Sequence, residues 1–83
     1  MKKFFVLEVH RGRALNYFAL KTLKGAEKRF NEVLSWDGER KATIVEAEKA
    51  VYVRWAVREK ILGSPNHTYF QSQVQFIKGW GAD

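Results

Sequence analysis

Residues 22–38, TLKGAEKRFNEVLSWDG, constrain the fold most, because they form the one clear amphipathic helix pattern of the chain. One apolar stripe recurs there at helical spacing, and it consists of Leu23, Ala26, Phe30, Val33 and Leu34. Thr22 can cap the first turn through its hydroxyl, and Asp37-Gly38 supplies a stop, since glycine tolerates the conformation that ends helices. The flanking sequence is strand-like, so we expect this helix to cover a sheet.

The segment before the helix predicts a hairpin. Residues 3–10 alternate, with one purely apolar face (Phe5, Leu7 and Val9) predicted toward the core and one mixed face, which indicates an interior strand. Arg11-Gly12-Arg13 is typical of a tight connection. Residues 14–21 form the expected return strand; its core positions are Phe18 and Leu20, with Tyr17 outward.

The segment after the helix predicts three more strands. Residues 42–47 are β-branched, and residues 50–58 alternate cleanly, with Val51, Val53, Trp55 and Val57 on one face. A helix over residues 42–61 competes with this hairpin. After a loop at residues 62–66, residues 69–77 alternate again, with Phe70, Val74 and Phe76 predicted inward. Trp80 either docks on the body or projects into solvent.

These segments predict a single α+β domain over residues 1–83. We expect a mostly antiparallel sheet of four to five strands in the order ββαββ, plus a C-terminal strand, with a single helix packed on one face. The helix stripe should contact one set of strand residues: Phe5, Leu7, Phe18, Val53 and Trp55. One helix cannot cover both faces, so the second face should meet solvent, a partner or a ligand.

Charge and composition narrow the partner class. The 83 residues have a formal net charge of +6 and include no cysteine, and the pI is about 9.8. Residues 1–22 hold five basic and one acidic side chain, a net charge of +4. This balance favours an anionic partner. The apolar run near Phe4 is too short for a signal peptide or a membrane span, so we expect a cytoplasmic protein with no membrane partner.

The residues that could support catalysis do not form a recognisable motif. His10 and His67 fall in a strand and a loop without ligand-like spacing, and Gly12 and Gly25 stand alone rather than in a phosphate-binding loop. We therefore expect a non-enzymatic protein with no metal and no cofactor.

Candidate binding residues fall into two groups. Tyr17, Tyr52, Arg54 and Arg58 would share the uncovered sheet face, where aromatic and Arg side chains suit either a protein interface or stacked bases. A basic cluster at the first hairpin comprises Lys2, Lys3, Arg11, Arg13 and Lys21. Each group could also be an ordinary solvated surface.

One resemblance bears on function. ALKTLKGAEKRF (19–30), followed by ATIVEAEKAVYVRWAVREK (42–60), resembles the strand, helix and hairpin layout of small phage and mobile-element proteins, in particular certain small anti-CRISPR proteins. The resemblance is one of layout over about residues 4–60 and transfers no functional residue. It implies a non-enzymatic inhibitor that binds a CRISPR surveillance complex.

Two functions follow as hypotheses. The first is an inhibitor or adaptor that binds a host protein or nucleoprotein complex with an acidic surface. The second is direct binding of DNA or RNA by the basic hairpin and the Tyr/Arg face. We also expect a monomer or a weak homodimer, because Arg54 and Arg58 would approach their symmetry mates if two such faces met.

Overall fold

A computed structural model of the protein describes residues 2–10, 13–36, 40–63 and 69–82. The elements along the chain are β1 (Lys3–His10), β2 (Arg13–Leu20), α1 (Leu23–Trp36), β3 (Arg40–Ala47), α2 (Ala50–Leu62), the 3-10 turn η1 (Gln71–Gln73) and β4 (Val74–Gly79). The α+β class is confirmed. The single-helix ββαββ layout is wrong, because the described residues form two α-helices.

The strands form one antiparallel sheet in the order β2-β1-β3-β4. β1 pairs with β2 on one side and with β3 on the other, so the prediction of an interior strand is confirmed. Val6 lies opposite Phe18 in β2 and opposite Ile44 in β3, and side chains of paired residues share a face. This register decides which residues each helix can contact.

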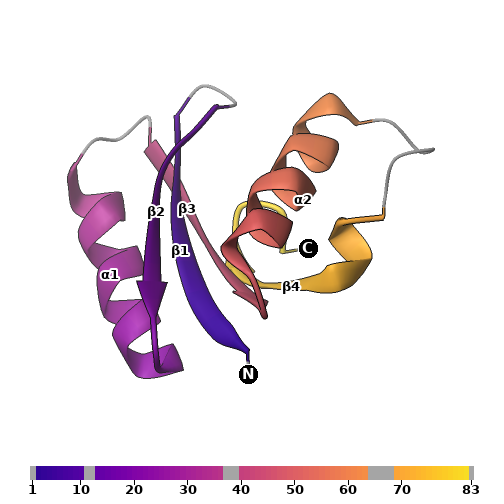
Figure 1. Ribbon diagram of the computed structural model, residues 1–83. Coiled ribbons are helices and arrows are strands. Elements are labelled where there is room, and N and C mark those ends of the chain that lie inside the picture. Colours follow the sequence, from indigo (N-terminus) through magenta and orange to yellow (C-terminus); the bar gives the residue numbers. More distant parts are fainter. Residues whose placement is uncertain (1, 11–12, 37–39, 64–68, 83) are drawn as a thin grey trace.

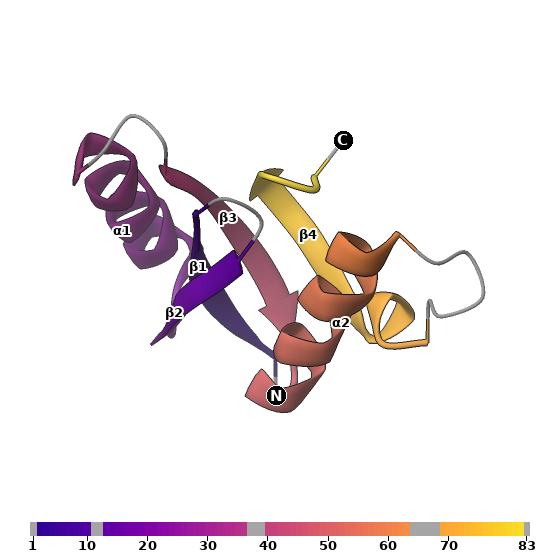
Figure 2. The ribbon, with the colours of Figure 1, turned by 90° about the horizontal axis from the view of Figure 1, so that it is seen from above.

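The two helices cover opposite faces of the sheet (Figures 1 and 2). On the α1 face, Ala26, Phe30 and Val33 pack with Val6, Ala42 and Ile44. On the α2 face, Val53 and Val57 pack with Phe5, Leu7, Val45 and Ala47. The sheet is therefore the middle layer of three. The prediction that one sheet face would be left without a helix is wrong, because each face is covered by one helix.

The amphipathic helix forms where the sequence predicts it, but fewer residues of its apolar stripe are buried than expected. The Thr22 hydroxyl accepts a hydrogen bond from the Gly25 N–H at 3.1 Å, which confirms the predicted cap. Leu23 and Leu34, however, are 39% and 43% exposed and belong to the edges of the stripe. Asp37-Gly38, the predicted stop, lies outside the described residues.

The predicted contacts of this helix are largely wrong. Phe18 packs on the α1 face, as expected, whereas Phe5, Leu7 and Val53 belong to the core on the α2 face, and Trp55 is exposed. The reason is that β1 is apolar on both faces, so alternation alone did not say which face the helix would cover.

Residues 50–58 form the first part of α2 rather than a strand. The competing helix over 42–61 is confirmed for residues 50–61 and wrong for its first part, because β3 occupies Arg40–Ala47. Val53 and Val57 fit the repeat of a strand as well as that of a helix, since residues i and i+4 share a face in both. Ala56, outward in the strand reading, is fully buried. α2 ends at Gly63, whose φ of 65° is the left-handed helix stop that glycine permits.

The C-terminal strand is present but begins later than predicted. Phe70 precedes η1, and β4 starts only at Val74. Val74 and Phe76 pack toward the α2 core, as expected. Trp80 docks on the body: its backbone N–H donates to the Ala42 carbonyl at 3.0 Å, and its ring meets the Phe76 ring edge-on at 6.4 Å between centroids.

Candidate functional site

The outward side of α2 carries large apolar side chains that the fold leaves in water. Val51, Trp55, Ile61 and Leu62 are 45%, 41%, 41% and 68% exposed. The opposite side of the same helix is buried against the sheet. A helix that is apolar on both sides is normally covered on both sides. The exposed side of α2 is therefore the strongest candidate for contact with another molecule.

Two arginines complete this surface. Arg54 and Arg58 are exposed and lie on the same side of α2. The outer α2 surface, as we name it, consists of Val51, Arg54, Trp55, Arg58, Ile61 and Leu62. Its positions 51, 55, 58 and 62 follow in steps of four, three and four, which keeps them on one stripe of a helix.

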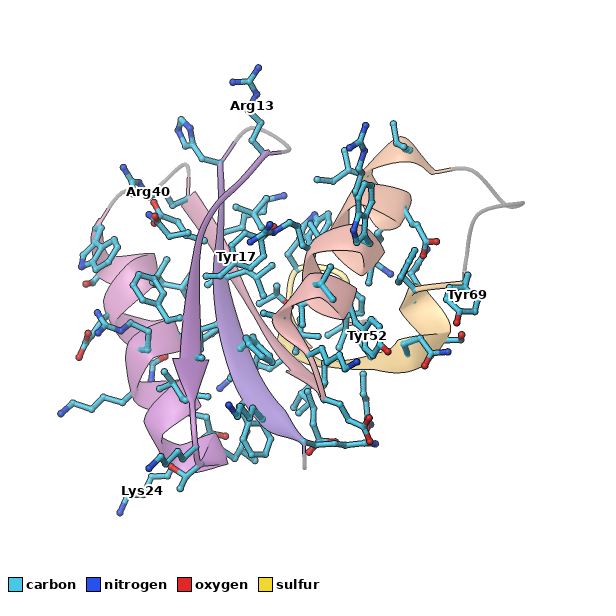
Figure 3. All side chains as sticks on the ribbon, viewed as in Figure 1. Arg13, Tyr17, Lys24, Arg40, Tyr52 and Tyr69 are labelled. Atoms are coloured by element: carbon cyan, nitrogen blue, oxygen red, sulfur yellow. The ribbon has the colours of Figure 1, made fainter. Side chains whose placement is uncertain are left out.

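An aromatic cluster adjoins this surface. The Trp55 ring is stacked on the Phe70 ring at 6.1 Å between centroids, and Tyr52 lies 6.2 Å from the same ring. Tyr69 meets Phe70 edge-on at 5.0 Å and is itself 67% exposed. Figure 3 shows Tyr52 on α2 and Tyr69 beside η1. The segment before β4 therefore extends the aromatic surface of α2.

Cationic side chains lie over three of the nearby rings. The Arg58 guanidinium carbon is 5.2 Å from the centroid of the Trp55 ring, and the Lys49 ammonium is 5.6 Å from that of Tyr52. Arg54 lies 5.7 Å from the centroid of Tyr17 on β2. Such contacts are worth about 0.5–1 kcal/mol at exposed sites and restrict where each cation can point.

The charge of the outer α2 surface has no acidic counterpart in the same helix. Glu59 is the sole acidic residue of α2, and it is buried. Its carboxylate accepts hydrogen bonds from the N–H groups of Phe70 (3.2 Å) and Gln71 (2.9 Å). Glu59 thus anchors the η1 turn to α2, and the exposed side of the helix stays positive.

Tyr17 is the one residue in this region whose titration is clearly shifted. Burial between β2 and α2 raises the pKa of the Tyr17 phenol, and the positive charge of Arg54 opposes part of that rise. Burial thus favours the neutral phenol, and the Tyr17 ring packs against the core on the α2 face.

The structure brings only some of the predicted site residues together. Tyr17 and Arg54 are in contact, and Tyr52, Arg54 and Arg58 share α2. They do so on a helix and beside it, however, and not on an open sheet face, so the prediction that they line an uncovered sheet is wrong. The physical reason is that α2 itself covers that face.

The predicted basic hairpin cluster divides into two parts. Lys2, Lys3 and Lys21 lie at one end of the β1–β2 pair, whereas Arg13 projects at the other end (Figure 3). Eight-residue strands separate these ends by about 25 Å. Arg11 lies outside the described residues. The lysines and Arg13 therefore cannot form one compact site.

Sequence reasoning missed the apolar half of the outer α2 surface. Trp55 was predicted in the core, Val51 was predicted on the same strand face, Ile61 was assigned no role and Leu62 was placed in a loop. The spacing of 51, 55, 58 and 62 was visible in the sequence, but it indicates an exposed stripe only after residues 53, 56 and 57 are known to be buried.

A second polar feature lies on the α1 face and serves the fold. Glu8 is fully buried in β1, where its carboxylate forms an ion pair with Arg40 and accepts a hydrogen bond from the Asn16 side chain at 2.8 Å. Glu8 belongs to the mixed face of residues 3–10, for which the sequence predicted no cover, and this is wrong because α1 covers that face. Within the described ranges, no three His, Asp or Glu side chains are arranged to hold a metal ion.

Neither helix of the described residues is long and apolar enough to cross a bilayer. No protein-family model, curated protein or solved structure matches the chain.

Proposed function

We propose that this protein is a non-enzymatic binding protein that uses its outer α2 surface to bind an acidic surface of another protein or nucleoprotein complex. One observation carries the proposal: the exposed side of α2 combines Trp55, Ile61 and Leu62 with Arg54 and Arg58. Trp and Arg are the residues that most often dominate binding energy at protein interfaces, whereas solvent-facing helices are usually polar on their outer side.

The buried carboxylates support a binding role over a catalytic one. Glu8 is engaged by Arg40 and Asn16, and Glu59 is engaged by two backbone N–H groups. Both carboxylates thus accept hydrogen bonds from other parts of the fold and serve its stability. An inhibitor or adaptor, of the kind that the resemblance to small anti-CRISPR proteins implies, is the specific form of binding protein that we propose, acting in the cytoplasm.

The test is capture of a partner that depends on α2. The tagged chain and two variants, Trp55→Ala and Trp36→Ala, are used as baits in a bacterial lysate with and without nuclease. Trp36 ends α1 and is 49% exposed, against 41% for Trp55, so it is a matched control. We expect the same partner with wild type and Trp36→Ala, and loss with Trp55→Ala, regardless of nuclease. Equal capture by all three baits would refute the proposal.

Direct binding of single-stranded nucleic acid is the second candidate. The observation that favours it is the set of exposed rings with adjacent cations, Tyr52 with Lys49 and Trp55 with Arg58. Bases stack on such rings while cations contact phosphates. If Lys49, Arg54 and Arg58 each contacted one phosphate, affinity for oligothymidylate would fall about 20-fold between 50 and 200 mM salt. Absence of binding at 50 mM salt would remove this candidate.

A further inference from the structure

We propose that the element bound by the outer α2 surface is an amphipathic α-helix with acidic side chains, packed lengthwise along α2. This inference rests on the proposed function and specifies its partner. The structural observation behind it is the single stripe formed by Val51, Trp55, Arg58 and Leu62 on the exposed side of a helix whose other side is fixed to the sheet.

The spacing of the stripe fits a helix better than an extended chain. Steps of four, three and four residues are those of a helix–helix seam, in which side chains of one helix fill the spaces of the other. A seam of this kind packs at about 20° and with axes about 8–10 Å apart. The 13 residues of α2 give a seam about 20 Å long, enough to contact about four turns of an occupant.

The charges specify an acidic occupant. Arg54 and Arg58 are four residues apart, so they lie on neighbouring turns of the same side of α2, Arg58 within the stripe and Arg54 beside it. The Trp55 ring already holds Arg58 in place, and the one acid of α2 is turned inward toward η1. Asp or Glu side chains beside the apolar seam of the occupant would meet both cations.

A second copy of this chain fits the surface poorly. Residue 56 is the midpoint of α2, so antiparallel two-fold packing would place Arg54 of one copy opposite Arg58 of the other. Parallel packing would place each arginine opposite its own mate. Like charges brought together out of water disfavour both arrangements. We therefore expect a monomer in light scattering at low micromolar concentration, and a stable dimer that Arg54→Glu strengthens would overturn the inference.

The direct test uses the isotopically labelled full chain and designed peptides. The probe is a capped peptide of about four turns with Leu at the a and d positions, Glu at e and g, and Ala elsewhere. We expect it to shift the amide resonances of residues 51–62 in a saturable way. Three comparison ligands are a shuffled peptide of identical composition, the same peptide with Lys in place of Glu, and oligothymidylate.

The expected results separate shape from charge. The shuffled and Lys peptides should bind at least about tenfold more weakly than the probe. The double variant Arg54→Glu/Arg58→Glu should reverse the preference, binding the Lys peptide and losing the Glu peptide. Because both arginines are exposed, this variant should keep its fold, which its unchanged amide spectrum away from α2 would verify.

Several results would overturn the inference. No shift of the α2 amides at about 1 mM probe, equal binding of the shuffled peptide, or shifts confined to another element would each exclude a helical occupant on this surface. Shifts of the same amides by oligothymidylate alone would assign the surface to nucleic acid. If lysate capture still depended on Trp55 after the probe failed, the proposed function would stand and only the helical form of the partner would be wrong.

Discussion

The buried ion pair between Glu8 and Arg40 allows the sharpest test of this structure. Glu8 has no exposed surface and lies in the central strand β1, while the Arg40 side chain at the start of β3 is 31% exposed. Asn16 on β2 donates the second bond to the carboxylate. The pair thus joins three neighbouring strands, and its two members differ strongly in their access to water.

This difference predicts unequal costs for removing each partner. Arg40→Met removes the cation and leaves the buried carboxylate its hydrogen bond from Asn16, and breaking a buried pair costs about 3–5 kcal/mol. We expect about 3 kcal/mol, the lower end, because water can enter where Arg40 was. Glu8→Leu should cost about 1 kcal/mol or less, since Arg40 can turn to solvent and an apolar side chain suits the buried position. Glu8→Leu/Arg40→Met should then be near wild type.

Urea unfolding at pH 7, followed by circular dichroism, measures all four proteins and closes a double-mutant cycle. A loss of about 3 kcal/mol is a large part of the about 5–15 kcal/mol that stabilises a typical domain, so it should be obvious in the midpoint. An Arg40→Met variant that lost under about 1 kcal/mol would refute the reasoning. So would a Glu8→Leu variant less stable than Arg40→Met, because that order would mean that Glu8 is not buried as described.

Three further predictions concern the other packed regions. Phe30→Ala should cost about 3–5 kcal/mol in urea unfolding, because Phe30 is buried between α1 and the sheet. Leu34→Ala should cost about 1 kcal/mol or less, because Leu34 is half exposed. Equal losses would mean that another face of α1 packs on the sheet. Glu59→Ala should speed amide exchange in the η1 turn, as two N–H groups lose their acceptor; unchanged exchange would contradict this. Because the pKa of Tyr17 is raised in the fold, folding holds its proton more tightly, so stability should be kept below about pH 10 and fall above it. Tyr17→Phe should show a smaller fall between pH 9 and 11 in the same assay.

The parts of the fold that the sequence predicted correctly are those governed by local rules. α1 follows from an unambiguous stripe and the Thr22 cap, since both depend on neighbours within one or two turns. The β1–β2 hairpin follows from alternation on both sides of a short connection. These features do not depend on how the elements pack together, so the sequence alone was sufficient for them.

The second helix could not be assigned from local rules. Val51, Val53 and Val57 favour strand by propensity, but strand propensity mainly reflects the packing surroundings of a residue. The deciding factor was the apolar α2 face of the sheet, with Phe5, Leu7 and Val45, which Val53 and Val57 of α2 cover. The same non-local factor decided the side of the sheet to which α1 binds.

The candidate site changed with that assignment, although some of its residues did not. The sequence placed Tyr52, Arg54 and Arg58 on an exposed surface, and the arginines are indeed exposed. The sequence could not place Trp55, Ile61 and Leu62 beside them, because a strand reading turns Trp55 inward. An interface of arginine and tyrosine alone would favour nucleic acid, whereas the aliphatic side chains favour protein.

The surface that we propose for a partner therefore lies on the helix that covers the sheet and not on the sheet itself. With a single helix, one sheet face would have been left to solvent; with two, α1 and α2 cover one face each. Of the eight exposed large hydrophobic side chains of the described residues, four lie on α2: Val51, Trp55, Ile61 and Leu62. Ala56 is buried and Trp55 is 41% exposed, so one turn of α2 has both an inner and an outer side. Because Val53 and Val57 fix α2 to the core, the helix that carries the outer stripe is formed before any partner binds. A preformed helix loses less conformational entropy on binding than a segment that must fold first, which favours affinity.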